Sequence, residues 1–158
     1  MKKLKFLSFL MAALTLVVAC SDKDDDKNAN PLISVEYNGT KWETTTVVAS
    51  YTSVTDGTMI NATKISSQDQ LVISFTGTTT GTQIFADPGE GALFSISLAG
   101  LGSYTTLFTG GNVGELVITK YDNEKKLISG TFHCTAENFE GDVIEFTNGQ
   151  FSNIPVMN

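Results

Sequence analysis

The sequence predicts an all-β domain, a single antiparallel meander of about eight to ten strands that closes as a β-sandwich or a flattened barrel. Two observations indicate this fold class. From Leu32 onward, short runs of Thr, Val, Ile and Phe alternate with polar residues, and Gly, Asn and Asp separate the runs. No window of this region has an apolar stripe with helical spacing. Strands with one apolar face have to bury that face, so the sheet is expected to close.

The first predicted hairpin joins residues 33–37 to residues 40–44 through Asn38-Gly39, the strongest short turn signal for antiparallel strands. A two-residue loop places Ile33 and Trp42 on one apolar face, and packing in the core is the favoured role for Trp42. Glu36 and Lys41 form an opposite-charge pair on the other face. The loop sets these cross-strand pairs: Tyr37 with Thr40, Glu36 with Lys41, and Val35 with Trp42.

The middle of the chain predicts further strands, and residues 77–82 are interpreted as a flexible polar connection. The second strand is expected to continue through residue 51 and to turn at Asp56-Gly57. The following strands are expected at residues 58–65, 70–76 and 92–99, with a short one at 104–107.

The last third predicts strands at residues 115–121, 127–138 and 142–151. A three-residue loop at 139–141, with Gly141 in a left-handed conformation, brings the apolar residues of the last two strands onto one face. The pairs that follow are Ala136 with Ile144, Cys134 with Phe146, and Thr135 with Glu145.

The beginning of the chain is typical of an exported protein. Basic residues in 1–5 precede an apolar run, residues 6–18, which is shorter than the about 20 apolar residues of a spanning helix. We therefore expect residues 1–19 to be a signal peptide. Residues 20–30 are polar and acidic, which predicts a disordered tether. The single all-β domain is expected over residues 31–158.

The residues Val17-Val18-Ala19-Cys20 resemble the lipobox of bacterial lipoproteins. This resemblance implies cleavage before Cys20 and attachment of lipid to its thiol, so that the N-terminal lipid holds the protein in a membrane. The acidic run after Cys20 is similar to the export tag of Bacteroidetes-type surface lipoproteins. That similarity implies an outer-membrane anchor with the domain facing outward.

Composition excludes nucleic acid as a partner and an internal disulfide. Cleavage before Cys20 removes three lysines and no acid, which takes the formal net charge from −7 to −10. The chain contains no arginine. An acidic chain without guanidinium groups is unsuited to phosphates, so nucleic-acid binding is excluded. Only Cys134 remains after lipidation, so no internal disulfide is possible.

The candidates for a chemical site are weak. His133 and Cys134 are adjacent on one strand and point to opposite faces, so they cannot act together; Cys134 is expected in the core and His133 on the surface. A single histidine and no second thiol leave a zinc site short of ligands. Acidic residues gather near two turns and are interpreted as solvated surface. They are Glu137, Glu140, Asp142 and Glu145 near one turn, and Asp87 and Glu90 near the other.

Aromatic residues offer one further binding signal. Tyr104 and Tyr121 lie near predicted loops, so their rings are expected to be exposed and are the candidate contacts for a partner.

Three segments resemble a family of small Bacteroidetes-type lipoproteins of unknown function: residues 38–42 (NGTKW), 129–132 (SGTF) and 147–153 (TNGQFSN). They consist of strand and turn residues, so the resemblance implies a fold and no catalytic residues.

The favoured hypothesis is a non-enzymatic surface lipoprotein that binds a glycan or protein partner and needs no cofactor or metal. One alternative is a small-ligand carrier, a lipocalin-like closed barrel with an apolar cavity of several hundred Å³. The other is a glycoside hydrolase, which needs two carboxyl groups roughly 5 to 10 Å apart in one cleft.

Overall fold

The computed structural model describes residues 30–85 and 91–157. These residues form eleven strands and no helix, which confirms the all-β prediction. None of them belongs to a helix that is long and apolar enough to cross a membrane. The predicted signal peptide, Cys20, Asp87 and Glu90 lie outside the described residues, as does the predicted tether except for Asn30. The strands are β1 Ile33–Tyr37, β2 Thr40–Thr44, β3 Val47–Thr52, β4 Gly57–Lys64, β5 Asp69–Thr76, β6 Gly81–Ile84, β7 Leu93–Leu98, β8 Gly102–Thr105, β9 Gly114–Asp122, β10 Leu127–Glu137 and β11 Val143–Met157.

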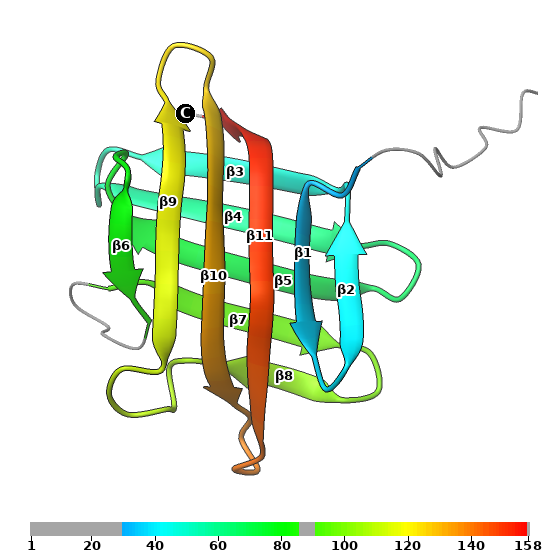
Figure 1. Cartoon of the computed structure of the whole chain (residues 1–158). Helices are drawn as coiled ribbons and strands as arrows, with labels where there is room; N and C mark the ends of the chain where they lie inside the picture. The colour runs from blue at the N-terminus through cyan, green and yellow to red at the C-terminus, as the bar shows by residue number, and fades with distance from the viewer. Residues whose placement is uncertain (1–29, 86–90, 158) are drawn as a thin grey trace, which may run out of the picture.

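The strands lie in two layers that cross one another (Figure 1). One layer contains β3, β4, β5, β7 and β8, and the other contains β6, β9, β10, β11, β1 and β2. The layers join where β11 pairs in parallel with β3 through Val156 and Ala49, and where β10 pairs with β8 through Glu137 and Thr105. Together with the pairing of β10 and β11, these contacts close a ring of strands, with β1–β2 attached at β11 and β9–β6 attached at β10. This arrangement is consistent with the predicted sandwich or flattened barrel. The eleven strands and the parallel β3–β11 pair differ from a simple antiparallel meander.

Both predicted hairpin registers are confirmed. In β1 and β2, Val35 is opposite Trp42 and Glu36 is opposite Lys41. Asn38 and Gly39 have φ angles of 47° and 74°, as their turn requires. In β10 and β11, Cys134 is opposite Phe146, Thr135 opposite Glu145 and Ala136 opposite Ile144, and Gly141 has a φ of 89°.

Four predicted elements have different limits. The second strand ends at Thr44 instead of continuing to residue 51, because the chain crosses there from one layer to the other. The Thr44 hydroxyl holds this corner: it accepts from the Thr46 N–H at 3.1 Å and donates to the Thr63 carbonyl at 2.7 Å. Residues 77–82, predicted as a flexible connection, contain the start of β6. This edge strand is held in an extended conformation by its pairing with β9. β8 begins and ends two residues before the predicted 104–107, and β11 extends to Met157.

The length of β11 depends on two irregular positions. Asn148 and Asn153 have φ angles of 53° and 50°, which asparagine tolerates better than most residues. Register shifts accompany them in the pairing with β10, as expected of β-bulges, which bend a strand. The bent strand pairs with β1 and β10 along most of its length and with β3 at its end.

Two buried glycines in these strands make room for aromatic rings. A Cβ on Gly149 would lie 2.6 Å from the ring of Phe132, and a Cβ on Gly130 would lie 2.5 Å from the ring of Phe151. Each glycine is the register partner of the phenylalanine that covers it. Gly130, Phe132, Asn148, Gly149 and Phe151 all belong to the segments that resemble the lipoprotein family, so those segments carry information about the fold.

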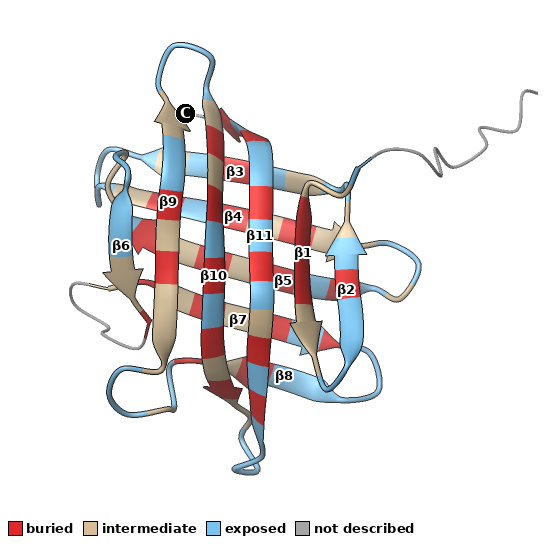
Figure 2. Ribbon diagram, viewed as in Figure 1, coloured by how far each residue is buried: buried red, intermediate tan, exposed pale blue. Residues whose placement is uncertain are grey.

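Side chains fill the space between the layers. Buried and exposed residues alternate along the strands, so each layer turns one apolar face inward (Figure 2). Phe94 of β7 has the rings of Phe146, Phe132 and Phe85 around it, at centroid distances of 4.9, 5.8 and 6.2 Å. The centre of the fold is therefore a packed core.

One buried carboxylate belongs to this core. Asp69 accepts hydrogen bonds from the indole N–H of Trp42 (3.0 Å), the hydroxyl of Ser67 (2.6 Å) and the backbone N–H of Ala99 (2.8 Å). Trp42 is 1% exposed, which confirms its predicted place in the core. Burial raises the pKa of the Asp69 carboxyl, but the three hydrogen bonds and the charge of Lys64 together bring it below its usual value. Asp69 thus connects β2 with the β7–β8 turn.

Candidate binding surface

The predicted positions of His133 and Cys134 are confirmed. Cys134 is buried in the core and His133 is exposed on the other face of β10. Burial raises the pKa of the Cys134 thiol, so little thiolate is present at neutral pH. The two side chains do not form a nucleophile-and-base pair.

The acidic residues of the last hairpin surround a turn that its own side chains hold. Asn138 Oδ1 accepts from the backbone N–H groups of Glu140 (2.9 Å) and Asp142 (2.8 Å), and Asn138 Nδ2 donates to Asp142 Oδ2 (3.2 Å). Among the described residues, no group of three or more His, Cys, Asp or Glu side chains is placed to hold a metal ion.

The expected exposure of the two tyrosines is wrong for Tyr104. Its ring is only 5% exposed, and its hydroxyl donates to the carbonyl of Leu101 at 3.3 Å. The cause is register: Tyr104 is opposite Ile96, so both side chains point into the core. Tyr121 is half-buried, with its hydroxyl 3.5 Å from that of Thr58.

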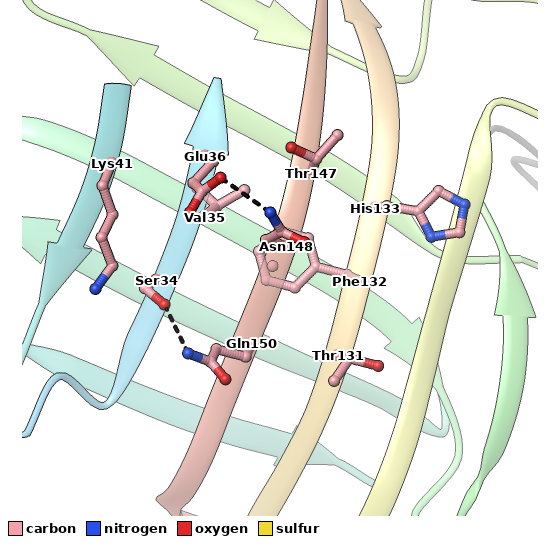
Figure 3. Close-up of a pocket in the computed structure, with 11 residues that line it drawn as sticks. Ser34, Val35, Glu36, Lys41, Thr131, Phe132, His133, Thr147, Asn148 and Gln150 are labelled. Atoms are coloured by element: carbon pink, nitrogen blue, oxygen red, sulfur yellow. Dashed lines mark hydrogen bonds between the residues drawn. The ribbon is translucent and has the colours of Figure 1, made fainter. Parts of the chain in front are cut away.

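One surface hollow, the polar hollow, lies on the outer face of β1, β2, β10 and β11 and has a volume of about 680 Å³ (Figure 3). Four of its polar side chains bond to one another in two pairs. Asn148 Nδ2 donates to Glu36 Oε2 at 2.9 Å, and Gln150 Nε2 donates to Ser34 Oγ at 3.3 Å. Lys41 points away from Glu36, and its ammonium forms an ion pair with Glu43 at 2.7 Å. Glu36 and Lys41 are thus opposite one another in the β1–β2 register, as predicted, but their charges do not form an ion pair.

The second hollow, the aromatic groove, lies on the outer face of the other layer and has a volume of about 350 Å³. Phe108 and Phe139 form one wall, with their ring centroids 4.7 Å apart. The rings are 42% and 87% exposed, unusual for large apolar side chains that touch. No charged side chain lines the groove among the described residues. Outward side chains of three strands form its floor: Gln70 and Val72 of β5, Ser95 and Ser97 of β7, and Ser103 and Thr105 of β8.

Hydrogen bonds hold the backbone of the two turns that carry these rings. Phe139 follows Asn138, whose side chain caps the β10–β11 turn. Phe108 lies between Thr106 and Thr109. Thr106 is fully buried: its N–H donates to the Phe94 carbonyl at 3.0 Å, and its hydroxyl accepts from the Phe94 N–H at 3.1 Å. The Thr109 hydroxyl donates to the Thr106 carbonyl at 2.8 Å. The aromatic wall is therefore built in advance of any partner.

The two turns that carry these rings lie at the end of the fold opposite to the point where the chain enters it. β1 begins at the upper end of its layer in Figure 1, whereas the β8–β9 loop and the β10–β11 hairpin lie at the lower end. The two turns that form the aromatic wall therefore lie at the end of the fold opposite to the start of β1.

Sequence reasoning missed this pair, because it considered only tyrosine and tryptophan as exposed rings. A local signal was present at Phe139, which is an apolar residue inside a predicted three-residue turn. No local signal connects it with Phe108, which comes from a different loop.

A family model described as a domain of unknown function (DUF6252) matches residues 29–155. The comparison with curated proteins found no match, and the comparison with solved structures found none either.

Proposed function

The chain belongs to the DUF6252 family, a domain of unknown function, and from this premise we propose that it is an exported, lipid-anchored protein that binds its partner without catalysis. The proposed anchor is the lipid on Cys20, and the proposed binding surface is the aromatic groove. The proposed location is the outer face of the outer membrane, with residues 20–30 as the tether.

The lipobox-like residues 17–20 after an apolar leader support the anchor. Each buried methylene of an acyl chain adds about 0.8 kcal/mol of membrane affinity, so several chains on one residue hold a protein durably. The acidic run after Cys20 supports export to the outer face.

The observation that supports binding is the exposed pair of Phe108 and Phe139 on an uncharged groove. Exposing two touching phenylalanine rings is costly in water, since each large apolar side chain gains about 1.5–3 kcal/mol when it is fully buried. A partner that covers the rings recovers part of that free energy.

The same surfaces favour this proposal over the alternatives. A carrier requires an apolar cavity, whereas packed side chains occupy the centre between the layers and the aromatic groove opens outward. A glycoside hydrolase requires two carboxyl groups in one cleft. Among the described residues, Glu36 is the one carboxylate that lines the polar hollow, and no acidic residue lines the aromatic groove.

Labelling with radioactive palmitate tests the anchor. Wild-type protein and Cys20→Ala are expressed in cells, with Cys134→Ala as the control because it removes the only other cysteine. We expect label and membrane association in the wild type and in Cys134→Ala, and neither in Cys20→Ala. Membrane association of unlabelled Cys20→Ala would contradict the proposal.

Protease treatment of intact cells tests the outward location. We expect external protease to degrade the wild-type domain. A variant in which Asp22, Asp24, Asp25 and Asp26 are changed to Asn is expected to stay protected behind the outer membrane. Equal protection of both proteins would contradict surface export by the acidic run.

A binding screen tests the surface. Detergent-solubilised full-length protein is applied to arrays of glycans and of proteins, in the wild type and in the variant Phe108→Ala/Phe139→Ala. The control is Val54→Ala, which removes an apolar side chain that is 91% exposed in the β3–β4 turn. We expect binding to survive Val54→Ala and to be lost in the double variant. Binding that the double variant retains would exclude the aromatic groove as the site.

A further inference from the structure

We propose that the aromatic groove binds an uncharged, extended carbohydrate chain, an inference that rests on the proposed binding function and names the class of ligand. Three properties of the groove support this choice: it lacks charge, it has spare hydrogen-bonding groups in a row, and it has an aromatic wall.

The lack of charge separates the groove from the rest of the protein. Charged residues make up 17% of the chain, yet none of the described residues that line the groove is charged. A charged partner would have to give up water without gaining an ion pair, which is unfavourable. A neutral ligand has no such cost.

The floor of the groove carries two parallel rows of side chains. Gln70, Ser97 and Ser103 are register partners across β5, β7 and β8, so they form one row. Since strands are about 4.8 Å apart, this row is roughly 10 Å long. Val72, Ser95 and Thr105 form the second row.

The two rows differ in how their polar groups are used. The Thr105 hydroxyl already accepts from Ser95 Oγ (2.9 Å) and from the Leu107 N–H (3.2 Å), and it donates to the Phe94 carbonyl (3.1 Å). By contrast, the side chains of Gln70, Ser97 and Ser103 make no hydrogen bond with another described residue. The first row thus presents an amide and two hydroxyls, which both donate and accept, as the hydroxyl groups of a sugar also do.

The rings of Phe108 and Phe139 supply the apolar complement. The C–H face of a sugar ring can lie against an aromatic face while its hydroxyl groups reach neighbouring polar side chains. The two rings stand beside the floor and are held by capped turns, so a sugar would meet a preformed surface.

A peptide or a second protein fits these features less well. Extended peptides bind through the free edge of a strand, but β5 and β7 pair on both sides, so most of the floor consists of strand faces. A stable protein interface covers about 800 Å² on each partner and has a polar rim, whereas only a few polar side chains on its floor line the groove among the described residues. An apolar partner would also bury the first row without hydrogen bonds.

The test is a binding titration with soluble neutral glucans and mannans, and with heparin and polygalacturonate as charged polysaccharides. The protein is the detergent-solubilised full chain, as wild type and as Phe139→Ala, Ser97→Ala and Val54→Ala. All three variants alter exposed side chains, and unchanged thermal unfolding checks that each is folded.

We expect a neutral polysaccharide to bind and the charged ones not to bind. Phe139→Ala should weaken binding about tenfold through the lost ring contact, and Ser97→Ala about threefold to tenfold through one lost hydrogen bond. Val54→Ala should bind as the wild type does. Failure of every neutral polysaccharide, or binding that Phe139→Ala and Ser97→Ala leave unchanged, would overturn the inference.

Two further outcomes separate this inference from the proposed function. If a defined protein on the array binds and Phe108→Ala/Phe139→Ala abolishes that binding, the carbohydrate inference fails while the proposed function stands. If sedimentation velocity shows self-association that the double variant loses, the groove is an interface between copies and the carbohydrate inference also fails. If no binding depends on the two rings, both proposals fail.

Discussion

Replacing Asp69 with asparagine should destabilise the fold strongly, although the two side chains have nearly the same size. The carboxylate accepts from three donors that belong to Trp42, Ser67 and Ala99. In Asp69→Asn, the remaining oxygen can keep the bond from the Ala99 N–H. The new NH₂ group then faces the indole N–H of Trp42, so two donors meet and the indole N–H is left without an acceptor.

The expected loss follows from these contacts. Leaving the buried indole N–H without an acceptor costs about 1–3 kcal/mol, and the bond from Ala99 loses the assistance of a full charge. Ser67 is only partly buried and can turn to water, so it contributes little. The free energy of unfolding should fall by roughly 2–4 kcal/mol, out of about 5–15 kcal/mol for an ordinary domain.

Urea unfolding monitored by tryptophan fluorescence measures this loss, because Trp42 is the only tryptophan and bonds directly to Asp69. Glu124→Gln is the control, since it removes one negative charge at an exposed position and should change stability by less than about 0.5 kcal/mol. Trp42→Phe removes the indole donor, so combined with Asp69→Asn it should cost less than the sum of the two single losses. Because neither Trp42→Phe nor the double variant contains a tryptophan, urea unfolding of all variants in this comparison is followed by far-UV circular dichroism.

Acid should reduce the difference between the wild type and Asp69→Asn. The pKa of Asp69 is lower in the folded protein than in the unfolded chain, where it is about 3.9. The ionised carboxylate therefore contributes stability above that value, and the contribution is lost as the pH falls through the folded pKa. An Asp69→Asn protein as stable as Glu124→Gln at pH 7, or a difference that grows in acid, would refute this account.

Two further predictions concern the core. Gly149→Ala should lower the free energy of unfolding by about 1–3 kcal/mol, because the new Cβ would lie 2.5 Å from the Phe132 carbonyl oxygen. Gly110→Ala has no heavy atom within 4 Å of its Cβ and should change stability little in the same urea assay; equal effects would contradict the packing argument. Cys134 should react with a thiol reagent orders of magnitude more slowly in the native protein than in urea, because burial raises the pKa of its thiol and excludes the reagent. Rapid labelling of the native protein would show that the core opens readily at β10.

Several features of this fold could be predicted because neighbouring residues determine them. Asn38-Gly39 sets the β1–β2 register, and the loop ending at Gly141 sets the pairing of Cys134 with Phe146. Side chains alternate with a period of two in a strand, so each turn also assigned Trp42 and Cys134 to the core.

Other features depend on contacts between distant parts of the chain and have no local pattern. The start of β6 was interpreted as a loop because its own residues give no strand pattern. It forms a strand by pairing with β9, which is distant in the sequence. Tyr104 was expected to be exposed because it lies near a predicted loop. Its pairing with Ile96 of β7 instead turns the ring into the core, and the local sequence does not contain that pairing. Phe108 and Phe139 meet only because β8 and β10 close the ring next to the turns that carry them.

By itself, the sequence determined the fold class, the hairpin registers and the inward or outward direction of most strand residues, since turn chemistry and the two-residue period act over a few positions. Tertiary structure decided how the layers close, where β11 bends to reach β3, and which surface carries the aromatic groove. The physical reason is that a strand in a hairpin also pairs with a strand from a distant part of the chain. Packing across the whole core determines which strand that is, and no short segment contains that information.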